Sequence, residues 1–172
     1  MKLTDQREIA AERQTVWEAI LNPEVLKACI PGCEELTGSP EDGFEAVVVQ
    51  KVGPVKAKFK GEVTISDVVE GESLTLSGQG KGGPAGFASG SADVRLSEIE
   101  AGTLLEYDVV AKVGGKLAQL GSRIIDGFAK KLAGQFFERF QEGLEPELEE
   151  AAEEETGQKE TKKGWIGRMF KA

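Results

Sequence analysis

The chain's 172 residues, 40% hydrophobic and 30% charged, are enough for one soluble globular domain with its own core. Its formal net charge of −9 argues against sequence-independent binding of nucleic acid, which requires a basic surface that displaces phosphate counterions. The absence of histidine excludes a Ser-His-Asp triad, a Cys-His pair and a histidine-ligated zinc within this chain.

The chain begins with a predicted strand and two short helices. Residues 2–9, KLTDQREI, alternate weakly and predict the strand. Four apolar residues then follow at helical spacing, namely Val16, Trp17, Ile20 and Leu21. Pro23 ends this helix and opens the next one over PEVLKAC. The charged N-terminal segment has no apolar run typical of a signal peptide, and no stretch of about 18 apolar residues follows, so we expect a cytoplasmic protein.

From Glu34 to Val113 the pattern changes to a period of two, which is typical of strands with one buried face. The predicted strands cover residues 44–52, 55–67, 72–81, 86–99 and 103–113. Gly53-Pro54, EGES and IEAGT between them are typical of tight turns. Strands joined by such short turns form an antiparallel meander.

A long amphipathic helix is predicted from about Lys116 to Leu144. Its apolar face is formed by Leu117, Leu120, Ile124, Phe128, Leu132, Phe136 and Phe140. The order of elements therefore predicts an α+β fold in which this helix covers the apolar face of the antiparallel sheet. Gly121, Gly127 and Gly134 each cost about 1 kcal/mol relative to alanine inside a helix, so we expect close contacts at these positions.

The inner face of the predicted sheet is rich in small residues. Lys58 and Lys60 point to one side of their strand, whereas Phe59 and Gly61 point to the other. The same alternation selects these candidate cavity residues: Val48, Gln50, Phe59, Leu76, Gly90, Ala92, Tyr107 and Val109, with Leu120, Ile124 and Phe128 from the helix. Small residues on this face either let the helix pack closer to the sheet or leave a cavity for an apolar ligand. A sharply curved sheet with glycine kinks and a packed core is the alternative.

No catalytic or metal site is predicted. Asp67 and Asp93 are not paired by the pattern, and we interpret them as solvated side chains or turn caps. Gln50 and Tyr107 are predicted to point inward, where each needs a partner. That partner is either the other residue or a carbonyl of a ligand, and the structural partner is favoured.

Two further motifs have simpler interpretations. The segment GQGKGG matches a dinucleotide fingerprint, but a strand follows it instead of a helix, so we expect a hairpin tip at the cavity mouth. Cys29 and Cys33 lack other soft ligands and are predicted to be free, buried or half-buried thiols, with a redox pair as the alternative.

The predicted domain covers residues 1–145. Residues 146–161 are dense in charge and predict a flexible acidic linker. Residues 162–172 form a basic amphipathic tail, in which Trp165, Ile166, Met169 and Phe170 share one helical face beside Lys162, Lys163, Arg168 and Lys171. This combination predicts weak, reversible docking on the inner face of the cytoplasmic membrane. Docking on the protein's own acidic surface or on a partner protein is the alternative.

Four segments resemble a known family: NPEVLKACIPGCEEL, VGPVKAKFKGEVTISD, GKGGPAGFASGSADVRL and VGGKLAQLGSRIIDGFAKKLAGQFFERF. Together they resemble the carbon monoxide dehydrogenase G-subunit family, part of the START/Bet v 1-like (SRPBCC) ligand-binding superfamily, up to about residue 145. The resemblance implies a helix-grip fold, in which a curved antiparallel sheet wraps around a long C-terminal helix with a hydrophobic cavity between them. It also implies an accessory role beside molybdenum-containing carbon monoxide dehydrogenases or related hydroxylases, including their recruitment to the cytoplasmic membrane.

These observations predict a non-catalytic protein that binds a hydrophobic ligand, an isoprenoid quinone, without a covalently bound cofactor. Its partners would be the quinone, a molybdenum hydroxylase and an anionic membrane, but not nucleic acid. It would recruit the enzyme to the membrane or pass electrons to the quinone pool. A ligand-free membrane tether or assembly factor is the alternative. An enzyme acting on an apolar substrate is a third hypothesis, disfavoured because no histidine or acid-base pair is present.

Overall fold

The computed structural model describes residues 1–145. The predicted linker (146–161) and the predicted membrane-binding tail (162–172) lie outside the described residues. The membrane contacts of the tail therefore stay a prediction.

The described residues form one sheet of seven antiparallel strands in the order β1-β7-β6-β5-β4-β3-β2. The strands are β1 (Lys2–Ile9), β2 (Cys33–Ser39), β3 (Gly43–Val52), β4 (Val55–Val69), β5 (Ser73–Lys81), β6 (Phe87–Ile99) and β7 (Gly102–Gly114). The helices are α1 (Arg13–Ile20), α2 (Pro23–Cys29), the 3-10 turn η1 (Gly83–Ala85), α3 (Lys116–Gln119) and α4 (Ser122–Leu144). The predicted α+β helix-grip fold is confirmed.

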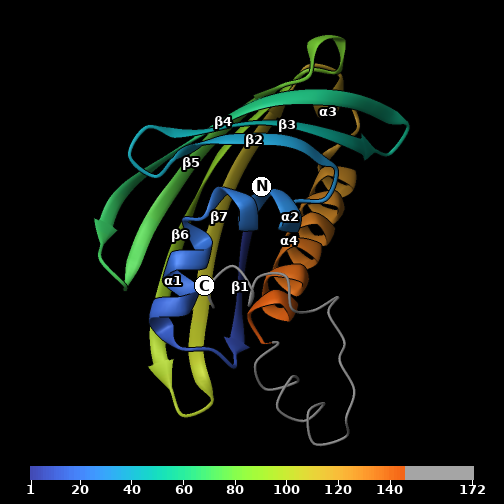
Figure 1. Cartoon of the computed structure of the whole chain (residues 1–172). Helices are drawn as coiled ribbons and strands as arrows, with labels where there is room; N and C mark the ends of the chain where they lie inside the picture. The colour runs from blue at the N-terminus through green and yellow to red at the C-terminus, as the bar shows by residue number, and fades with distance from the viewer. Residues whose placement is uncertain (146–172) are drawn as a thin grey trace, which may run out of the picture.

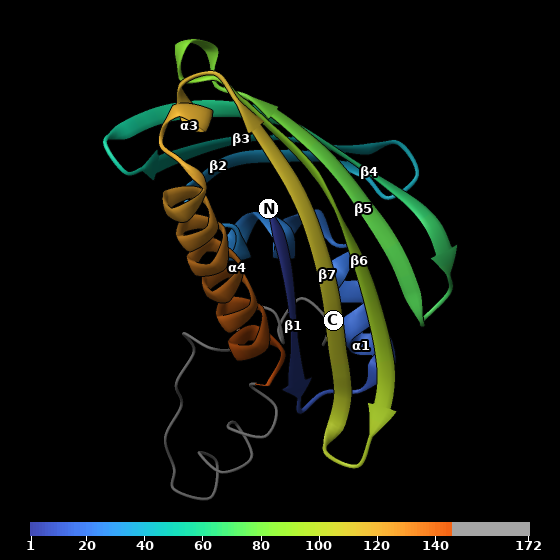
Figure 2. The same cartoon turned by 180° about the vertical axis from the view of Figure 1, so that it is seen from behind.

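The sheet is strongly curved, and α4 runs along its concave side (Figures 1 and 2). Helices α1 and α2 pack on the same side, near the C-terminal end of α4. The opposite side of the sheet carries the polar half of each alternating strand, as β4 shows with exposed Lys56, Lys58 and Lys60. The helices therefore cover only the apolar face, which is the arrangement that the period-two pattern predicts.

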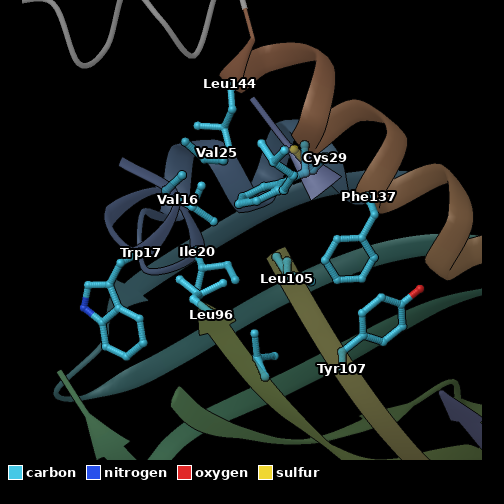
Figure 3. Packing of buried hydrophobic residues seen from close by; sticks show 14 of the residues in the cluster. Val16, Trp17, Ile20, Val25, Cys29, Leu96, Leu105, Tyr107, Phe137 and Leu144 are labelled. Atoms are coloured by element: carbon cyan, nitrogen blue, oxygen red, sulfur yellow. The ribbon is translucent and has the colours of Figure 1, made fainter. Parts of the chain in front are cut away.

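The hydrophobic core occupies one end of the concave side, where the sheet, the helices α1 and α2, and α4 meet (Figure 3). Helix α1 contributes Val16 and Trp17, which are almost completely buried. Helix α4 contributes Phe137 and Phe140, and β7 contributes Leu105. Truncating a buried aromatic residue to alanine costs about 3–5 kcal/mol, so these contacts dominate the stability of this end.

The predicted strands and turns are confirmed, with one addition. The sequence pattern predicts no separate strand between the two short helices and Phe44, whereas the structure forms β2 there, at the edge of the sheet. Gly53 and Pro54 form the two-residue turn between β3 and β4, with Val52 and Val55 as register partners. Strand β2 has a weak alternating pattern because it pairs on one side only and a register shift follows Cys33.

The prediction of one continuous helix from Lys116 to Leu144 is wrong. The chain forms the short α3, breaks at Leu120 and Gly121, and then starts α4 at Ser122. Gly121 has φ +90° and ψ 155°, a backbone conformation that is essentially restricted to glycine. The expected close contacts are also wrong, because a Cβ added at Gly121, Gly127 or Gly134 would meet no heavy atom within 4 Å.

Two glycine substitutions should therefore have opposite effects on stability. Gly121→Ala is expected to lower the free energy of unfolding by about 1–3 kcal/mol, because alanine must adopt the strained conformation at the break. Gly127→Ala is expected to raise it by about 1 kcal/mol, because the position is helical and has free space. Urea denaturation of the two variants measures both changes, and equal effects would contradict the broken helix.

Candidate ligand-binding cavity

A cavity of about 520 Å³ lies between the concave side of the sheet and α4. From the sheet and the N-terminus it is lined by Met1, Leu3, Val48, Gln50, Val52, Phe59, Gly61, Gly80, Ala88, Val109, Ala111 and Val113. From the helices and the loop after α2 it is lined by Ile30, Pro31, Leu117, Ile125, Phe128, Ala129, Leu132, Ala133, Phe136 and Phe137. Its volume falls within the range of small-molecule sites in proteins.

Small residues on both walls create the cavity. Gly61 and Gly80 are register partners on β4 and β5, and neither carries a side chain to fill the space in front of it. On the facing helix, Ala129 and Ala133 are one turn apart and present only methyl groups. Aromatic residues fill the core at the C-terminal end of α4. The empty volume therefore lies beside these small glycine and alanine residues.

Five of the eleven predicted cavity residues line the cavity. They are Val48, Gln50, Phe59, Val109 and Phe128. Four lie on the inner face of the sheet and one on α4, so the alternation predicted their side correctly. Their contact with a ligand stays a prediction.

The other six lie outside the lining, namely Leu76, Gly90, Ala92, Tyr107, Leu120 and Ile124. Leu76 and Tyr107 belong to the core region, where Tyr107 stacks on Phe137 with a centroid distance of 4.4 Å. Ala92 is the register partner of Leu76 and Val109. A Cβ on Gly90 would lie 2.5 Å from the Val110 carbonyl oxygen, so this position faces neighbouring backbone.

The break before α4 accounts for the two helix residues among these six. Leu120 lies in the break itself, and the side chain of Ile124 is 43% exposed. A continuous helix would have kept both on the apolar face, but the interruption turns the start of α4, and Ile125 lines the cavity instead.

The alanines of α4 and the loop after α2 line the cavity without having been predicted. The sequence contains a pattern that could have identified Ala129 and Ala133 as lining residues. They are small and one helical turn apart, and they directly follow the apolar Phe128 and Leu132. Ile30 and Pro31 have no such pattern, because only the tertiary fold brings the turn after α2 to the cavity wall.

Among the residues of 1–145 that line the cavity, Gln50 is the one with a polar side chain. Its amide nitrogen Nε2 donates a hydrogen bond to the backbone carbonyl oxygen of Pro31, so the favoured pairing of Gln50 with Tyr107 is wrong. An amide group has two N–H donors, and this hydrogen bond uses one of them. The other donor and the carbonyl oxygen of Gln50 are the polar groups that the side chain offers to a ligand.

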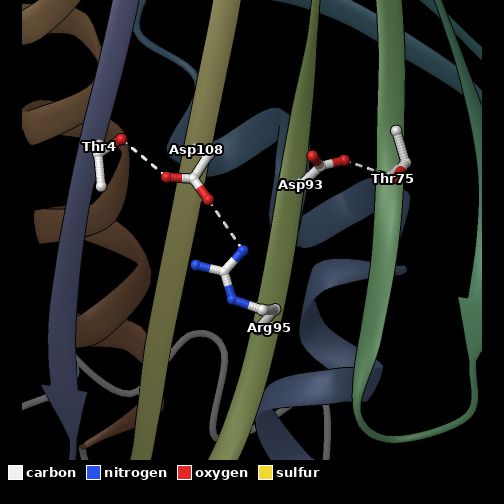
Figure 4. A network of polar contacts seen from close by, with 5 residues as sticks. All are labelled: Thr4, Thr75, Asp93, Arg95 and Asp108. Carbon is white, nitrogen blue, oxygen red and sulfur yellow. Dashed lines mark hydrogen bonds and ion pairs between the residues drawn. The ribbon is translucent and has the colours of Figure 1, made fainter.

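The carboxylates of Asp93 and Asp108 lie on the opposite, convex side of the sheet (Figure 4). The hydroxyl of Thr4 and the guanidinium of Arg95 donate to the two oxygens of Asp108, at 2.7 and 2.9 Å. These hydrogen bonds lower the pKa of Asp108 below its ordinary value. Asp93 accepts a hydrogen bond from Thr75 at 2.7 Å. Asp93 thus takes part in cross-strand pairing, in agreement with its non-catalytic interpretation.

The GQGKGG segment ends β5 and leads through η1 into the antiparallel strand β6. A dinucleotide fingerprint requires a helix at this point within a parallel βαβ unit, so the segment is not one. The predicted hairpin tip is confirmed for Gly82 and Gly83, whereas residues 78–81 belong to β5. Within residues 1–145, no group of three or more cysteine or carboxylate side chains is arranged to hold a metal ion.

Cys29 and Cys33 are free thiols, in agreement with the sequence prediction. Cys29 lies in the core, and burial raises the pKa of its thiol from 9.0 to about 12, against the opposing effect of Arg139. Burial also raises the pKa of Cys33, although the positive charge of Lys27 and a hydrogen bond with the backbone of Glu35 oppose the shift. Neither environment favours a reactive thiolate.

The two thiols should react very differently with iodoacetamide at pH 8. Cys29 is expected to stay unmodified in the folded protein, because a pKa of about 12 leaves almost no thiolate. Cys33 is half-buried and should react slowly. Mass spectrometry should find at most one modified cysteine in the native protein and two in urea. Equal labelling rates of both thiols in the native protein would contradict the burial of Cys29.

Comparison with solved structures shows the same architecture in bacterial proteins. A conserved protein from Geobacillus kaustophilus is 30% identical, with a TM-score of 0.77 over 84% of this chain and 95% of that one. Protein CV1439 from Chromobacterium violaceum is 15% identical, with a TM-score of 0.62 over 84% and 98%. Protein NE0264 from Nitrosomonas europaea is 18% identical, with a TM-score of 0.59 over 86% and 96%. The comparison with curated proteins gave no match.

The curved sheet, the long C-terminal helix and the apolar cavity between them define a helix-grip protein of the SRPBCC class. The family model of the carbon monoxide dehydrogenase G subunit (CoxG) matches residues 6–145. The chain therefore belongs to this CoxG family, as its sequence resemblance predicts. None of the helices within residues 1–145 is both long and apolar enough to cross a bilayer.

Proposed function

We propose that this protein is a non-catalytic accessory protein that holds a hydrophobic ligand, an isoprenoid quinone, between the sheet and α4. The observation that carries the proposal is the 520 Å³ cavity, whose lining is apolar except for Gln50. Removing an isoprenoid chain from water contributes about 25 cal/mol to the free energy of binding for each Å² of apolar surface buried. This contribution requires no charged group in the site.

The single polar side chain of the lining suits a quinone better than a plain hydrocarbon. A quinone ring carries carbonyl oxygens that accept hydrogen bonds, and Gln50 keeps one N–H donor after its bond to Pro31. Burying a carbonyl without a donor is costly, so the ring would lie near Gln50 and the chain along the small residues. The Gly61, Gly80, Ala129 and Ala133 surfaces provide that path.

The partner in this proposal comes from the family. Membership in the CoxG family supports service to a molybdenum-containing carbon monoxide dehydrogenase or a related hydroxylase. The protein would recruit this enzyme to the cytoplasmic membrane, or pass its electrons to the quinone pool. The tail, with Trp165 and Phe170 among basic residues, would hold the protein at the inner face of that membrane.

Filling the cavity should abolish ligand binding and leave the fold intact. The double variant Ala129→Phe/Ala133→Phe places two rings in the empty volume, so overpacking of the core is avoided. The wild-type protein, purified from its native membranes and extracted with organic solvent, is expected to release about one quinone per chain by mass spectrometry. The double variant should release none, with a melting temperature within a few degrees of the wild type.

Ala28→Phe is the matched control, because Ala28 is exposed on α2 and lies outside the lining. It should release as much quinone as the wild type. An extract that stays empty after quinone is added to the wild type would refute the carrier function. A ligand-free tether or assembly factor would then be the remaining function of the family fold.

Replacing Gln50 should weaken quinone binding selectively. Gln50→Leu removes the donor, so the affinity for a short-chain quinone should fall by a factor of about 2 to 12, the equivalent of about 0.5–1.5 kcal/mol. The affinity for an isoprenoid hydrocarbon of the same length should stay the same or rise. Gln79→Leu, on the exposed side of β5, is the control. Equal losses for both ligands would place the quinone ring elsewhere.

A further inference from the structure

The two ends of the strands carry opposite charges. Loops at one end join β3 to β4, β5 to β6 and β7 to α3, and these loops lie near one another (Figure 2). The exposed lysines at and next to these loops, here called the basic end, are Lys51, Lys56, Lys60, Lys81, Lys112 and Lys116. The hairpins at the opposite end carry carboxylates instead, at Glu41, Asp42, Glu70, Glu72, Glu98 and Glu100.

Two lysine pairs of the basic end oppose each other across neighbouring strands. Lys51 of β3 is the register partner of Lys56 of β4, and Lys60 of β4 is the register partner of Lys81 of β5. Like charges in directly opposite positions destabilise a sheet. Within residues 1–145 none of these four forms an ion pair, whereas the nearby Lys58 pairs with Glu34 at 3.2 Å. The two pairs cost stability and leave positive charge that an external anionic surface could neutralise.

A shallow groove brings lysines from different elements together. Lys56 and Lys58 of β4 line it with Lys116 of α3, and the glycine-proline backbone of η1 forms its floor. Glu34 balances Lys58, and Glu62 and Asp126 are the nearest other carboxylates along β4 and α4. The groove therefore has a local excess of positive charge, although the chain as a whole is acidic.

The same end carries exposed apolar side chains. Phe87 is 52% exposed and is the register partner of Lys81. Ile124 is 43% exposed, and its Cγ2 would lie 3.7 Å from a Cβ at Gly53 in the β3–β4 turn. An aromatic and an aliphatic side chain among lysines is the composition of surfaces that enter the interface of an anionic bilayer. An acidic protein partner would need the charges but not the apolar residues.

The cavity reaches this end of the domain. Val52, Val113 and Leu117 line it, and each directly follows a lysine of the basic end in the sequence. In the two strands, alternation sends the lysine outward and the next residue inward. The strand lysines of the basic end therefore lie on the outer face of the same strand ends whose inner face lines the cavity.

We propose that the basic end is a docking surface for an anionic lipid bilayer, independent of the C-terminal tail. The charge separation along the strands would orient the domain with its acidic hairpins away from the membrane. The part of this proposal that concerns ligand transfer rests on the proposed function, since a quinone that leaves the bilayer would enter the cavity at the docked end. The docking itself rests only on the lysines and the exposed apolar residues.

Vesicle binding of the full chain tests the surface. The triple variant Lys56→Gln/Lys81→Gln/Lys116→Gln should bind vesicles of phosphatidylglycerol and phosphatidylcholine in equal parts about 100-fold more weakly than the wild type. Each lysine near such a surface contributes about fivefold, the equivalent of about 1 kcal/mol. Its melting temperature should be equal or higher, because two of the substitutions relieve like-charge pairs. Pure phosphatidylcholine vesicles should bind neither protein.

The matched control removes three positive charges elsewhere, as Arg13→Gln/Lys27→Gln/Arg139→Gln, and should bind within about threefold of the wild type. A second comparison replaces the four basic tail residues Lys162, Lys163, Arg168 and Lys171 with glutamine. The triple variant should weaken binding further in that background. If the triple variant binds like the wild type or like the control, the basic end is not a membrane surface.

Failure of the membrane-docking proposal can be distinguished from failure of the proposed quinone-carrier function. Vesicle binding that depends on the basic end, with an empty organic extract, would leave the docking surface valid and refute the carrier. A quinone in the extract, with vesicle binding unaffected by the triple variant, would do the reverse.

Discussion

The structure depends on the aromatic contacts that set the distance between α4 and the sheet. Tyr107 of β7 stacks on Phe137 of α4, with an interplanar angle of 16°. Phe136 and Phe140 pack around Phe137 at centroid distances of 4.9 and 6.2 Å. Aromatic pairs at these distances stabilise by more than their buried area alone, so this end of α4 is firmly held. Toward the N-terminus of α4 the facing residues are small, so the same distance between helix and sheet leaves the cavity.

This division of the concave side explains how one domain is both stable and hollow. The core of α1, α2 and the aromatic cluster stabilises one end, where Trp17 and Phe140 are almost completely buried. Phe136 and Phe137 belong both to this cluster and to the cavity lining, so the remaining lining residues can be small. Interiors without such a division are packed to crystal-like density, which leaves no room for a ligand.

The convex side and the strand ends serve a different purpose from the cavity. Thr4, Arg95 and Asp108 link three neighbouring strands through hydrogen bonds. Four lysines of the basic end instead oppose each other in two pairs that form no ion pair within residues 1–145, and carboxylates gather at the hairpins of the other end. A domain with this charge separation has a preferred orientation in the field of an anionic surface, even though its net charge is negative.

Much of the fold could be predicted from local patterns in the sequence. Alternation between Lys58, Phe59 and Lys60 assigns the faces of β4, and Pro23 marks the boundary between α1 and α2. These features depend on neighbours in the chain, so they can be read without the fold. The family resemblance extended this prediction to the helix-grip architecture, because its four segments span most of residues 22–140.

The cavity lining could be predicted only in part, because alternation gives the face of a residue but not its distance from α4. Gln50 and Tyr107 both point inward, yet Gln50 lines the cavity and Tyr107 is covered by Phe137. Gly121 changes the direction of the chain before α4, and this exchanges Ile124 for Ile125 in the lining. Local sequence patterns are enough to predict six of the seven strands, their faces and the small residues that make a cavity possible. The position of the cavity follows from the tertiary fold alone, because it depends on contacts between residues about 30 or more apart in the chain.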